Sequence, residues 1–274
     1  MPVISTNTAA NSAVRYLNIN SSQMSSSLSK LSSGSKITQA SDDAAGLAIS
    51  TRISSDVTTL QQAATNASQA TSILQTADGG ASNISDILSR MKSLASQSSS
   101  ATVTDSSRAY LNSEFTALSD QIDSIATGTR YSGQSLLDGT SAFAAGASVL
   151  VGSTSADTIT VTLDDLTSTT LGVDTLDIST QAGATAAIDA LDTAIDTVSG
   201  ARATIGAQES RFNFSASSIS TQSQNLQAAN SAITDVDIAA EQAKLSSSQV
   251  KVQAAVAAES SANQMPQYLL KLLG

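Results

Sequence analysis

The sequence predicts a mainly α-helical protein, in which the N- and C-terminal arms form a long antiparallel helical coiled-coil rod with a small β-hairpin region in the middle. Apolar residues recur at alternating steps of three and four over most of the 274 residues, which is the spacing of a coiled coil. Aromatic residues make up only 3% of the chain, so thin helix pairs are favoured over a thick globular core. The two prolines, Pro2 and Pro266, leave the stretch between them free to form helix.

The first predicted helix is followed by a polar loop. The apolar stripe of this helix is Val14, Leu17, Ser21, Met24, Leu28 and Leu31. Gly34 is expected to end the helix, and Ser41 or Asp42 to cap the next one. The loop also carries Lys36 and Asp43. An alternative is a metal or phosphate site built from Gly34, Lys36, Asp42 and Asp43, but the loop lacks the glycine spacing of a phosphate loop and the ligand number of a calcium loop.

The second predicted helix continues the same spacing beyond the loop. Its stripe is Ile53, Val57, Leu60, Ala64, Ala67, Thr71, Leu74, Ile84, Leu88, Met91 and Ala95. Gly79-Gly80 is expected to interrupt or strain this helix, because each glycine costs about 1 kcal/mol in a helix interior. A shorter helix follows, for which Thr104-Asp105 is the expected N-cap and Gly128 the expected stop.

Residues 131–180 form the only segment that the sequence predicts as β-structure. In TITVTLDD the residues Ile159, Val161 and Leu163 alternate with threonines, which is the period of a strand with one buried face. Residues 149–151 precede this run, and turn residues lie between them at 152–157. We therefore expect a β-hairpin here.

Helical spacing returns at Ile188 and persists to Val236, with Arg202, Glu209 and Gln222 at positions that face the predicted seam. If this helix is unbroken to Ala243, its roughly 56 residues form a rod of about 84 Å. Such a rod needs a partner along its side, and the N-terminal helices supply one. A final segment forms another apolar face, made of Ile238, Leu245, Val252 and the sequence QYLLKLLG.

Composition excludes several classes of function. A formal charge of −10 and a pI near 4.2 argue against nucleic acid or an anionic membrane as a partner. The chain has no histidine and no cysteine, so the usual zinc ligands, the usual general base and thiolate chemistry are missing, and we expect neither enzymatic activity nor a cofactor or metal. No Sec-type signal and no run of about 18 apolar residues is visible.

Three stretches of this sequence resemble bacterial flagellins, the subunits of the flagellar filament. Leu31-Ser32-Ser33-Gly34 followed by SDDAAGLAI (residues 41–49) is similar to the N-terminal signature of the family. SAITDVDIAAE (231–241) and ANQMPQYLLKLL (262–273) are similar to its closing motifs, and residues 151–178 to its hairpin segment. Ser35 and Thr234 depart from the family, in which an apolar residue and an arginine are common at these positions.

The resemblance implies an inner terminal coiled-coil domain, an outer helical domain and a short hairpin excursion in place of larger outer domains. In this sequence the inner domain would comprise residues 1–40 and 236–274, and would be disordered in the monomer. The outer rod would comprise residues 41–130 and 181–235, with the hairpin at 131–180. Gly34, Lys36, Asp42 and Asp43 would then belong to the connector between the inner and outer domains.

The resemblance also implies extracellular filaments for swimming, built by self-polymerisation after export through the flagellar type III secretion channel. The implied partners are other copies of the chain or other flagellins, an export chaperone, and filament cap and hook-associated proteins. The terminal polymerisation and chaperone face would contain Leu17, Met24, Leu28, Leu31, Leu245, Val252, Leu269 and Leu270. Arg90, Leu94 and Glu114 resemble a flagellin surface that an innate immune receptor recognises, and the alternative is a filament lattice contact without recognition.

Three other functions compete with the filament subunit. A hook-filament junction protein would share similarity at the termini, but we would expect poorer agreement in the middle than TITVTLDD shows. A zinc protease of the kind inserted in some flagellins would need histidines on one helix face, and the sequence has none. A soluble coiled-coil adaptor would form a fixed small oligomer and would not grow without limit.

Overall fold

The computed structural model describes residues 6–273, without the side chains of Pro266 and of residues 269–273. The chain divides into two compact units, which we describe separately. The terminal unit consists of Met1–Ser55 with Asn225–Gly274, and the central unit of Asp56–Gln224. Helices α2 (Ala44–Ser98) and α5 (Gln181–Thr234) contribute residues to both units.

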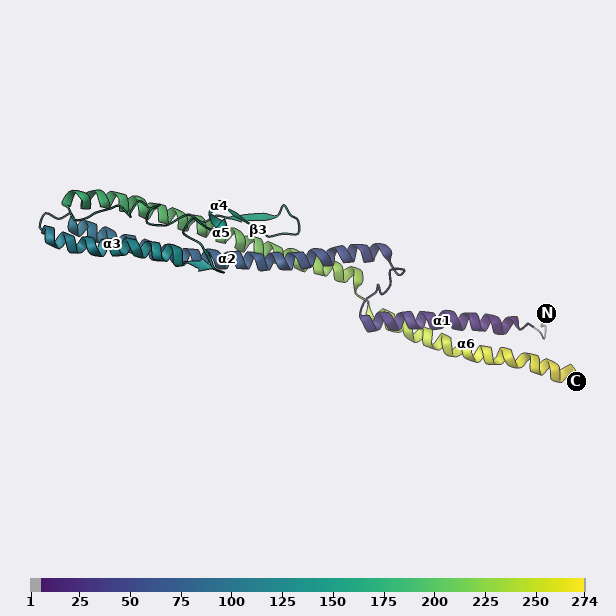
Figure 1. The fold of residues 1–274 in the computed structure, drawn as a ribbon. Helices are drawn as coiled ribbons and strands as arrows, with labels where there is room; N and C mark the ends of the chain where they lie inside the picture. Colours follow the sequence, from purple (N-terminus) through teal and green to yellow (C-terminus); the bar gives the residue numbers. More distant parts are fainter. Residues whose placement is uncertain (1–5, 274) are drawn as a thin grey trace. The chain divides into compact units, whose positions relative to one another are not determined.

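The central unit is built on α2, α5 and the shorter helix α3 (Asp105–Gly128), which lie side by side (Figure 1). Its core follows the predicted stripes of small and medium apolar residues. The largest fully buried side chains are Phe115, Phe212, Leu60, Leu74, Ile84, Leu88, Met91, Leu94, Ile122, Leu136, Leu137 and Leu166. The predicted boundaries of α3 are confirmed, since the Thr104 side chain accepts a hydrogen bond from the backbone N–H of Ser107 and the helix ends at Gly128. The mainly helical fold class is therefore confirmed.

The prediction that Gly79-Gly80 interrupts the second helix is wrong, because α2 runs through both residues. A Cβ atom on Gly80 would lie 2.5 Å from Thr129 Oγ1 and 2.8 Å from Leu137 Cδ1. A Cβ atom on Gly79 would meet nothing within 4 Å. Gly80 thus allows the segment after α3 to approach the backbone of α2 closely, and this packing outweighs its low helix propensity.

Substitution by alanine is expected to have opposite effects on the stability of the central unit at these two neighbouring glycines. Gly79→Ala is expected to raise the free energy of unfolding of the central unit by about 0.5–1 kcal/mol, because alanine is the better helix former at an unobstructed site. Gly80→Ala is expected to lower it by about 1–3 kcal/mol, because the added methyl overpacks the contact with Thr129 and Leu137. Urea denaturation of the two variants beside the parent chain measures both changes. A stabilising Gly80→Ala would contradict the close approach.

The predicted hairpin is confirmed in β3 (Ala147–Leu150) and β4 (Thr158–Val161), which pair antiparallel with Val149 opposite Ile159. Two side chains of the long helices bind it: Asn66 Nδ2 donates to Leu150 O at 3.2 Å, and Gln208 Nε2 donates to Thr162 O at 3.0 Å. The hairpin therefore packs against both long helices of the central unit.

Two further elements of the central unit were not predicted. Strands β1 (Arg130–Tyr131) and β2 (Gln134–Ser135) form a second, very short hairpin. Its two turn residues, Ser132 and Gly133, both have positive φ, which is the geometry of a tight two-residue hairpin turn. A four-residue helix, α4 (Ala142–Ala145), follows. Elements this short carry too few residues to show a periodicity.

The terminal unit contains α1 (Thr8–Ser33) and α6 (Ile238–Leu273), which run antiparallel side by side (Figure 1). Gly34, with φ of 70°, ends α1 as predicted. The condition of an unbroken helix to Ala243 is not met, because α5 ends at Thr234 and α6 begins at Ile238. Asp237 starts the new helix, since its carboxylate accepts a hydrogen bond from the N–H of Ala240 at 3.0 Å.

Candidate assembly surfaces

The two segments that link helices in the terminal unit, residues 34–43 and 235–237, pair with each other. The N–H of Lys36 donates to Thr234 O at 2.6 Å, and the N–H of Val236 donates to Gly34 O at 3.1 Å. Ser35 and Asp235 form an isolated antiparallel bridge. These contacts satisfy backbone groups that a continuous helix would have paired internally, so the break after Thr234 leaves these groups with partners.

The hydroxyl of Ser35 strengthens this crossing, since Ser35 Oγ lies 3.1 Å from Thr234 O and 2.9 Å from Ile37 O. The sequence marked Ser35 and Thr234 only as departures from a family pattern. In the structure the two departures meet. Sequence spacing cannot predict a hydrogen bond between the hydroxyl of one linker and a carbonyl group next to a second, distant linker.

The two aspartates of the first linker have different local roles. Asp42 Oδ2 accepts hydrogen bonds from the N–H and the hydroxyl of Thr38 and from the N–H of Gln39, and these bonds lower the pKa of the Asp42 carboxyl. Asp43 Oδ1 accepts from the N–H of Gly46 at 2.9 Å and caps α2. The prediction that Ser41 or Asp42 caps this helix is therefore wrong, because Asp42 closes the preceding turn.

Among the described residues, no three acidic side chains lie close enough together to hold a metal ion. The carboxylates of Asp42 and Asp43 are occupied by backbone N–H groups of their own segment, and Lys36 is exposed. The geometry supports a structural crossing rather than the alternative of a ligand site.

The seam between α1 and α6 is thin and partly polar. Asn7 Nδ2 donates to Ala262 O at 2.7 Å, and Ser27 Oγ donates to Glu241 Oε1 at 2.7 Å, which fixes the antiparallel register at both ends. The buried or half-buried positions are Ala10, Ala13, Leu17, Asn20, Met24, Ser27, Lys30 and Leu31 on α1, and Glu241, Leu245, Ser248, Val252, Ala255, Glu259 and Ala262 on α6. Both sets follow the three-four spacing, but several members are small or polar.

The predicted stripe of α1 is wrong at three of its six positions. Leu28 is 58% exposed, whereas its neighbour Ser27 is 6% exposed and occupies the seam. In the same way the observed seam uses Ala13 and Asn20 where the stripe named Val14 and Ser21. At two of the three positions, the stripe named the larger apolar residue, Val14 or Leu28, whereas the pair buries its smaller neighbour. Leu269 and Leu270 lie outside the residues whose side chains the structure describes.

Glu241 is a carboxylate at a buried seam position. It accepts hydrogen bonds from Ser27 Oγ and, at 3.0 Å, from Lys244 Nζ. The bond from Ser27 is the largest cause that lowers the pKa of Glu241, and Lys244 adds to it. A carboxyl with a lowered pKa in the folded pair stabilises that pair above its unfolded pKa, and the contribution is lost as the pH falls through the folded pKa.

Contact between α1 and α6 is therefore expected to weaken on acidification below about pH 4, in part through protonation of Glu241. The variant Glu241→Gln keeps an acceptor for Ser27 but does not titrate. In assembled filaments, its helix content, followed by circular dichroism between pH 7 and 3, should fall less steeply than that of the parent chain. Other carboxyls titrate equally in both proteins, so the difference between the two curves reports on Glu241. Identical curves would contradict the prediction.

Arg90 and Glu114 form an exposed ion pair between α2 and α3, with Arg90 Nη2 2.6 Å from Glu114 Oε1. Leu94 is only 1% exposed and belongs to the core, so the prediction that it lies on this surface is wrong. It follows Arg90 by one helical turn, but it belongs to the core cluster of the central unit. Tyr110, which sequence reasoning missed, is 79% exposed one turn before Glu114 on α3 and extends the surface.

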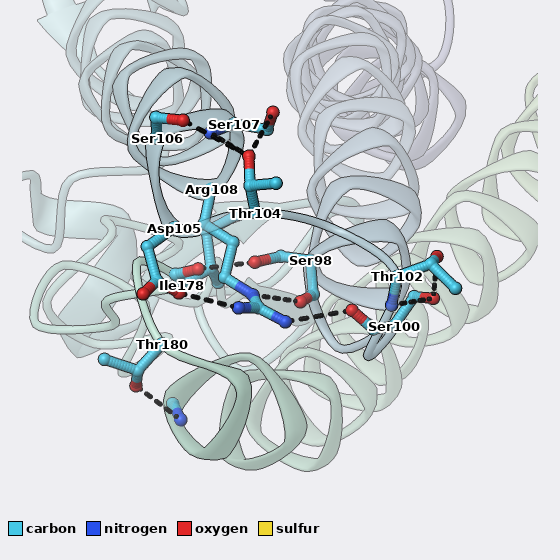
Figure 2. Close-up of polar contacts among 11 residues, drawn as sticks. Ser98, Ser100, Thr102, Thr104, Asp105, Ser106, Ser107, Arg108, Ile178 and Thr180 are labelled. Carbon is cyan, nitrogen blue, oxygen red and sulfur yellow. Dashed lines mark hydrogen bonds and ion pairs between the residues drawn. The ribbon is translucent and has the colours of Figure 1, made fainter.

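A buried arginine holds the turn between α2 and α3, as Figure 2 shows. Arg108 Nε donates to Ser98 O at 2.8 Å, Nη2 donates to Ser100 O at 2.9 Å, and Nη1 lies 2.9 Å from Asp105 Oδ1. Ser98 Oγ in turn donates to Ile178 O at 2.6 Å. No sequence pattern indicated this role of Arg108. Arg108 thus holds the turn, and Ser98 connects it to the segment before α5.

Comparisons with known proteins agree along almost the whole chain. A family model described as the bacterial flagellin N-terminal helical region matches residues 4–142, and one described as the bacterial flagellin C-terminal helical region matches residues 188–273. A flagellin of Halalkalibacterium halodurans is 37% identical over 273 residues, which cover 99% of each chain.

Solved structures give the same result for the fold. The crystal structure of Bacillus cereus flagellin matches with a TM-score of 0.52 and 33% identity, over 61% of this chain and 94% of that one. A structure from Vibrio parahaemolyticus, described as that of a flagellar hook-associated protein, matches with a TM-score of 0.58 but only 15% identity, over 70% and 99% of the chains. The second likeness shows a shared fold alone. No helix in the described part of the chain is long and apolar enough to cross a membrane.

Proposed function

The chain belongs to the bacterial flagellin family and is a structural subunit of the flagellar filament, and on this premise we propose how it reaches and enters that filament. It is exported unfolded through the flagellar type III secretion channel, folds at the distal end and joins a helical tube that turns outside the cell. Neither a cofactor nor a catalytic group takes part. The proposal rests mainly on the residues that the terminal helix pair leaves uncovered.

The described part of the α1–α6 pair carries large apolar side chains on its outer surface. The exposed ones are Val14, Tyr16, Ile19, Leu28, Ile238, Val250, Val256, Met265 and Tyr268. Two helices with a thin, partly polar seam cannot cover these side chains themselves. Packing of many copies would bury them, so assembly supplies most of the stability of this pair. This supports the inner location of residues 1–40 and 236–274, and their disorder before assembly.

The connector, the chaperone-binding face and the contacts at the filament ends are proposed on the same premise. The crossing of the linkers at Gly34 and Lys36, with the turn at Asp42 and Asp43, is the connector between the inner domain and the outer domain of residues 41–130 and 181–235. A dedicated export chaperone covers the apolar face with Leu245, Val252, Leu269 and Leu270. Cap and hook-associated proteins contact the two ends of the filament.

The Arg90–Glu114 surface is a lattice contact in this proposal. Its ion pair and the exposed Tyr110 make a mixed polar and aromatic patch, which is a composition typical of protein interfaces. The structure of the patch does not include Leu94, which weakens the alternative of recognition by an innate immune receptor.

Electron microscopy of the purified chain, before and after addition of a precipitating salt and short filament seeds, tests the proposal. Long tubes that grow from the seeds, together with a rise in helix content, are the expected result. A fixed small oligomer that never elongates would favour the coiled-coil adaptor. Immunogold labelling only at the filament base would favour the junction protein.

A further inference from the structure

A groove of about 560 Å³ runs along one side of the α1–α6 pair. It is lined by positions 23, 26, 27 and 30 of α1 and by positions 241, 243, 244, 247, 248 and 251 of α6. Four of these ten residues are serines, and nine of the ten are polar or charged. Three lysines stand among them: Lys30, Lys244 and Lys251.

The groove carries more positive charge than its own residues neutralise. Glu241 is the single carboxylate that lines it, and this carboxylate already accepts hydrogen bonds from Lys244 and Ser27. Among the described residues, Lys30 and Lys251 make no ion pair with an acidic side chain. Lys244 and Lys251 are seven residues apart on α6, so their ammonium groups project from one face about 10 Å apart. The arrangement is a row of cations along an open groove.

The charges of the whole chain are divided unequally between its two units. The terminal unit has 7 basic and 6 acidic residues, whereas the central unit has 6 basic and 17 acidic residues. The central unit therefore has a formal charge of −11, whereas the terminal unit has a formal charge of +1. Among copies of one chain at high local concentration, the abundant counter-charge for a lysine groove is this acidic surface.

We propose that the lysine groove binds carboxylates of the central unit of a second copy of the chain. The inference rests on the self-assembly set out above, and it names a contact that assembly would repeat at every subunit. Single ion pairs at a surface are weak, because solvent screens them and long side chains lose freedom. Repeated in each copy, however, they disfavour wrong registers, since a shifted copy would place uncompensated charges together. The groove would thus select how neighbouring copies are aligned.

Cross-linking in assembled filaments tests the contact directly. Filaments are grown from an equal mixture of unlabelled and ¹⁵N-labelled chains, and lysines are joined to adjacent carboxylates with a zero-length carbodiimide. We expect Lys30, Lys244 or Lys251 to be linked to peptides from residues 56–224, in the mixed-isotope pairs that only two different copies can produce. If the filaments form but these lysines are linked only within the terminal unit, or to nothing, the inference is overturned.

A charge-matched set of variants gives a second measurement. Lys251→Gln should raise the critical concentration for seeded growth by about two- to fivefold, whereas Lys251→Arg should leave it near the parent value. Arg52→Gln, which removes the same charge from an exposed site outside the groove, is the control. Circular dichroism checks that all variants keep their helix content.

The outcomes separate the inference from the proposal on which it rests. If the parent chain never elongates from seeds, the filament proposal fails, and the groove contact falls with it. If the parent elongates but Lys251→Gln behaves like Arg52→Gln, the groove contact alone is wrong. Binding of the groove to a free anion or to another acidic protein, with no inter-copy cross-links, would likewise overturn it.

Discussion

Deletion of residues 238–274 is expected to abolish growth of filaments from seeds while the central unit stays folded. The deletion removes α6, and with it every partner of the α1 seam, including the acceptor of the Ser27 hydrogen bond. An isolated helix of this length with a seam of Ala13, Asn20 and Ser27 is marginal in water. The exposed apolar residues of α6 disappear at the same time, so neither the pair nor its contacts with other copies can form.

The central unit does not depend on the deleted residues. Its core runs from Ala67 to Phe212, and all members of that cluster lie outside the deleted segment. Thermal unfolding followed by circular dichroism should therefore show a main transition within a few degrees of that of the parent chain, with reduced total helix signal. Electron microscopy of seeded samples should show no elongation. Normal filaments from the truncated chain would disprove the role of the terminal pair.

The long helices and the hairpin could be predicted because each contains many repeats of one signal. The stripe of α2 shows the three-four period from Leu60 to Ala95, and β4 alternates over a full strand. Predictions of secondary structure were wrong where a single tertiary contact decided whether a helix continues. Gly80 looked like a helix breaker, but Thr129 and Leu137 pack against the space that it leaves. A contact between residues 49 positions apart or more leaves no trace in local spacing.

The phase of a helix was harder to predict than its existence. A stripe through Leu28 and a stripe through Ser27 differ by one residue, and only the presence of α6 decides which one is buried. Hydrophobicity favoured Leu28, because most helices bury their larger apolar residues. Here Leu17, Met24 and Leu31 do line the seam, but Leu28 remains outside, where it can contact other molecules. The wrong prediction for Leu28 therefore identifies an apolar residue that is exposed for contact with other copies.

In the candidate surfaces, too, local features could be predicted from the sequence and tertiary contacts could not. Gly34 could be assigned from its residue type, since a helix commonly ends at a glycine with positive φ. The pairing of Ser35 with Asp235 could not, because it joins two linkers 200 residues apart. Arg90 and Glu114 were placed together correctly, but Leu94 required the position of α3 and α5 before its burial became evident. Sequence spacing locates residues on a helix, and tertiary packing decides which of them face solvent.

Phe212→Ala is expected to produce the largest loss of stability of any single substitution considered, about 3–5 kcal/mol in the free energy of unfolding of the central unit. Phe212 is fully buried and belongs to the core cluster of that unit. Its removal deletes a large apolar side chain and leaves a cavity that long, regular helices cannot easily close. Because alanine is a good helix former, the cost arises from packing and not from the helix itself.

Phe214→Ala is the matched control, since Phe214 lies two residues further along the same helix and is 76% exposed. Two residues apart on a helix point to nearly opposite sides, so the second substitution removes little packing and should change the unfolding free energy by no more than about 0.5 kcal/mol. Urea denaturation of the monomeric variants, followed by circular dichroism, measures both values under conditions in which filaments do not form. If the two variants lose equal stability, the burial of Phe212 in the central unit is wrong. If only Phe212→Ala loses stability while Phe214→Ala impairs seeded growth, then the buried phenylalanine stabilises the subunit and the exposed one contacts another copy.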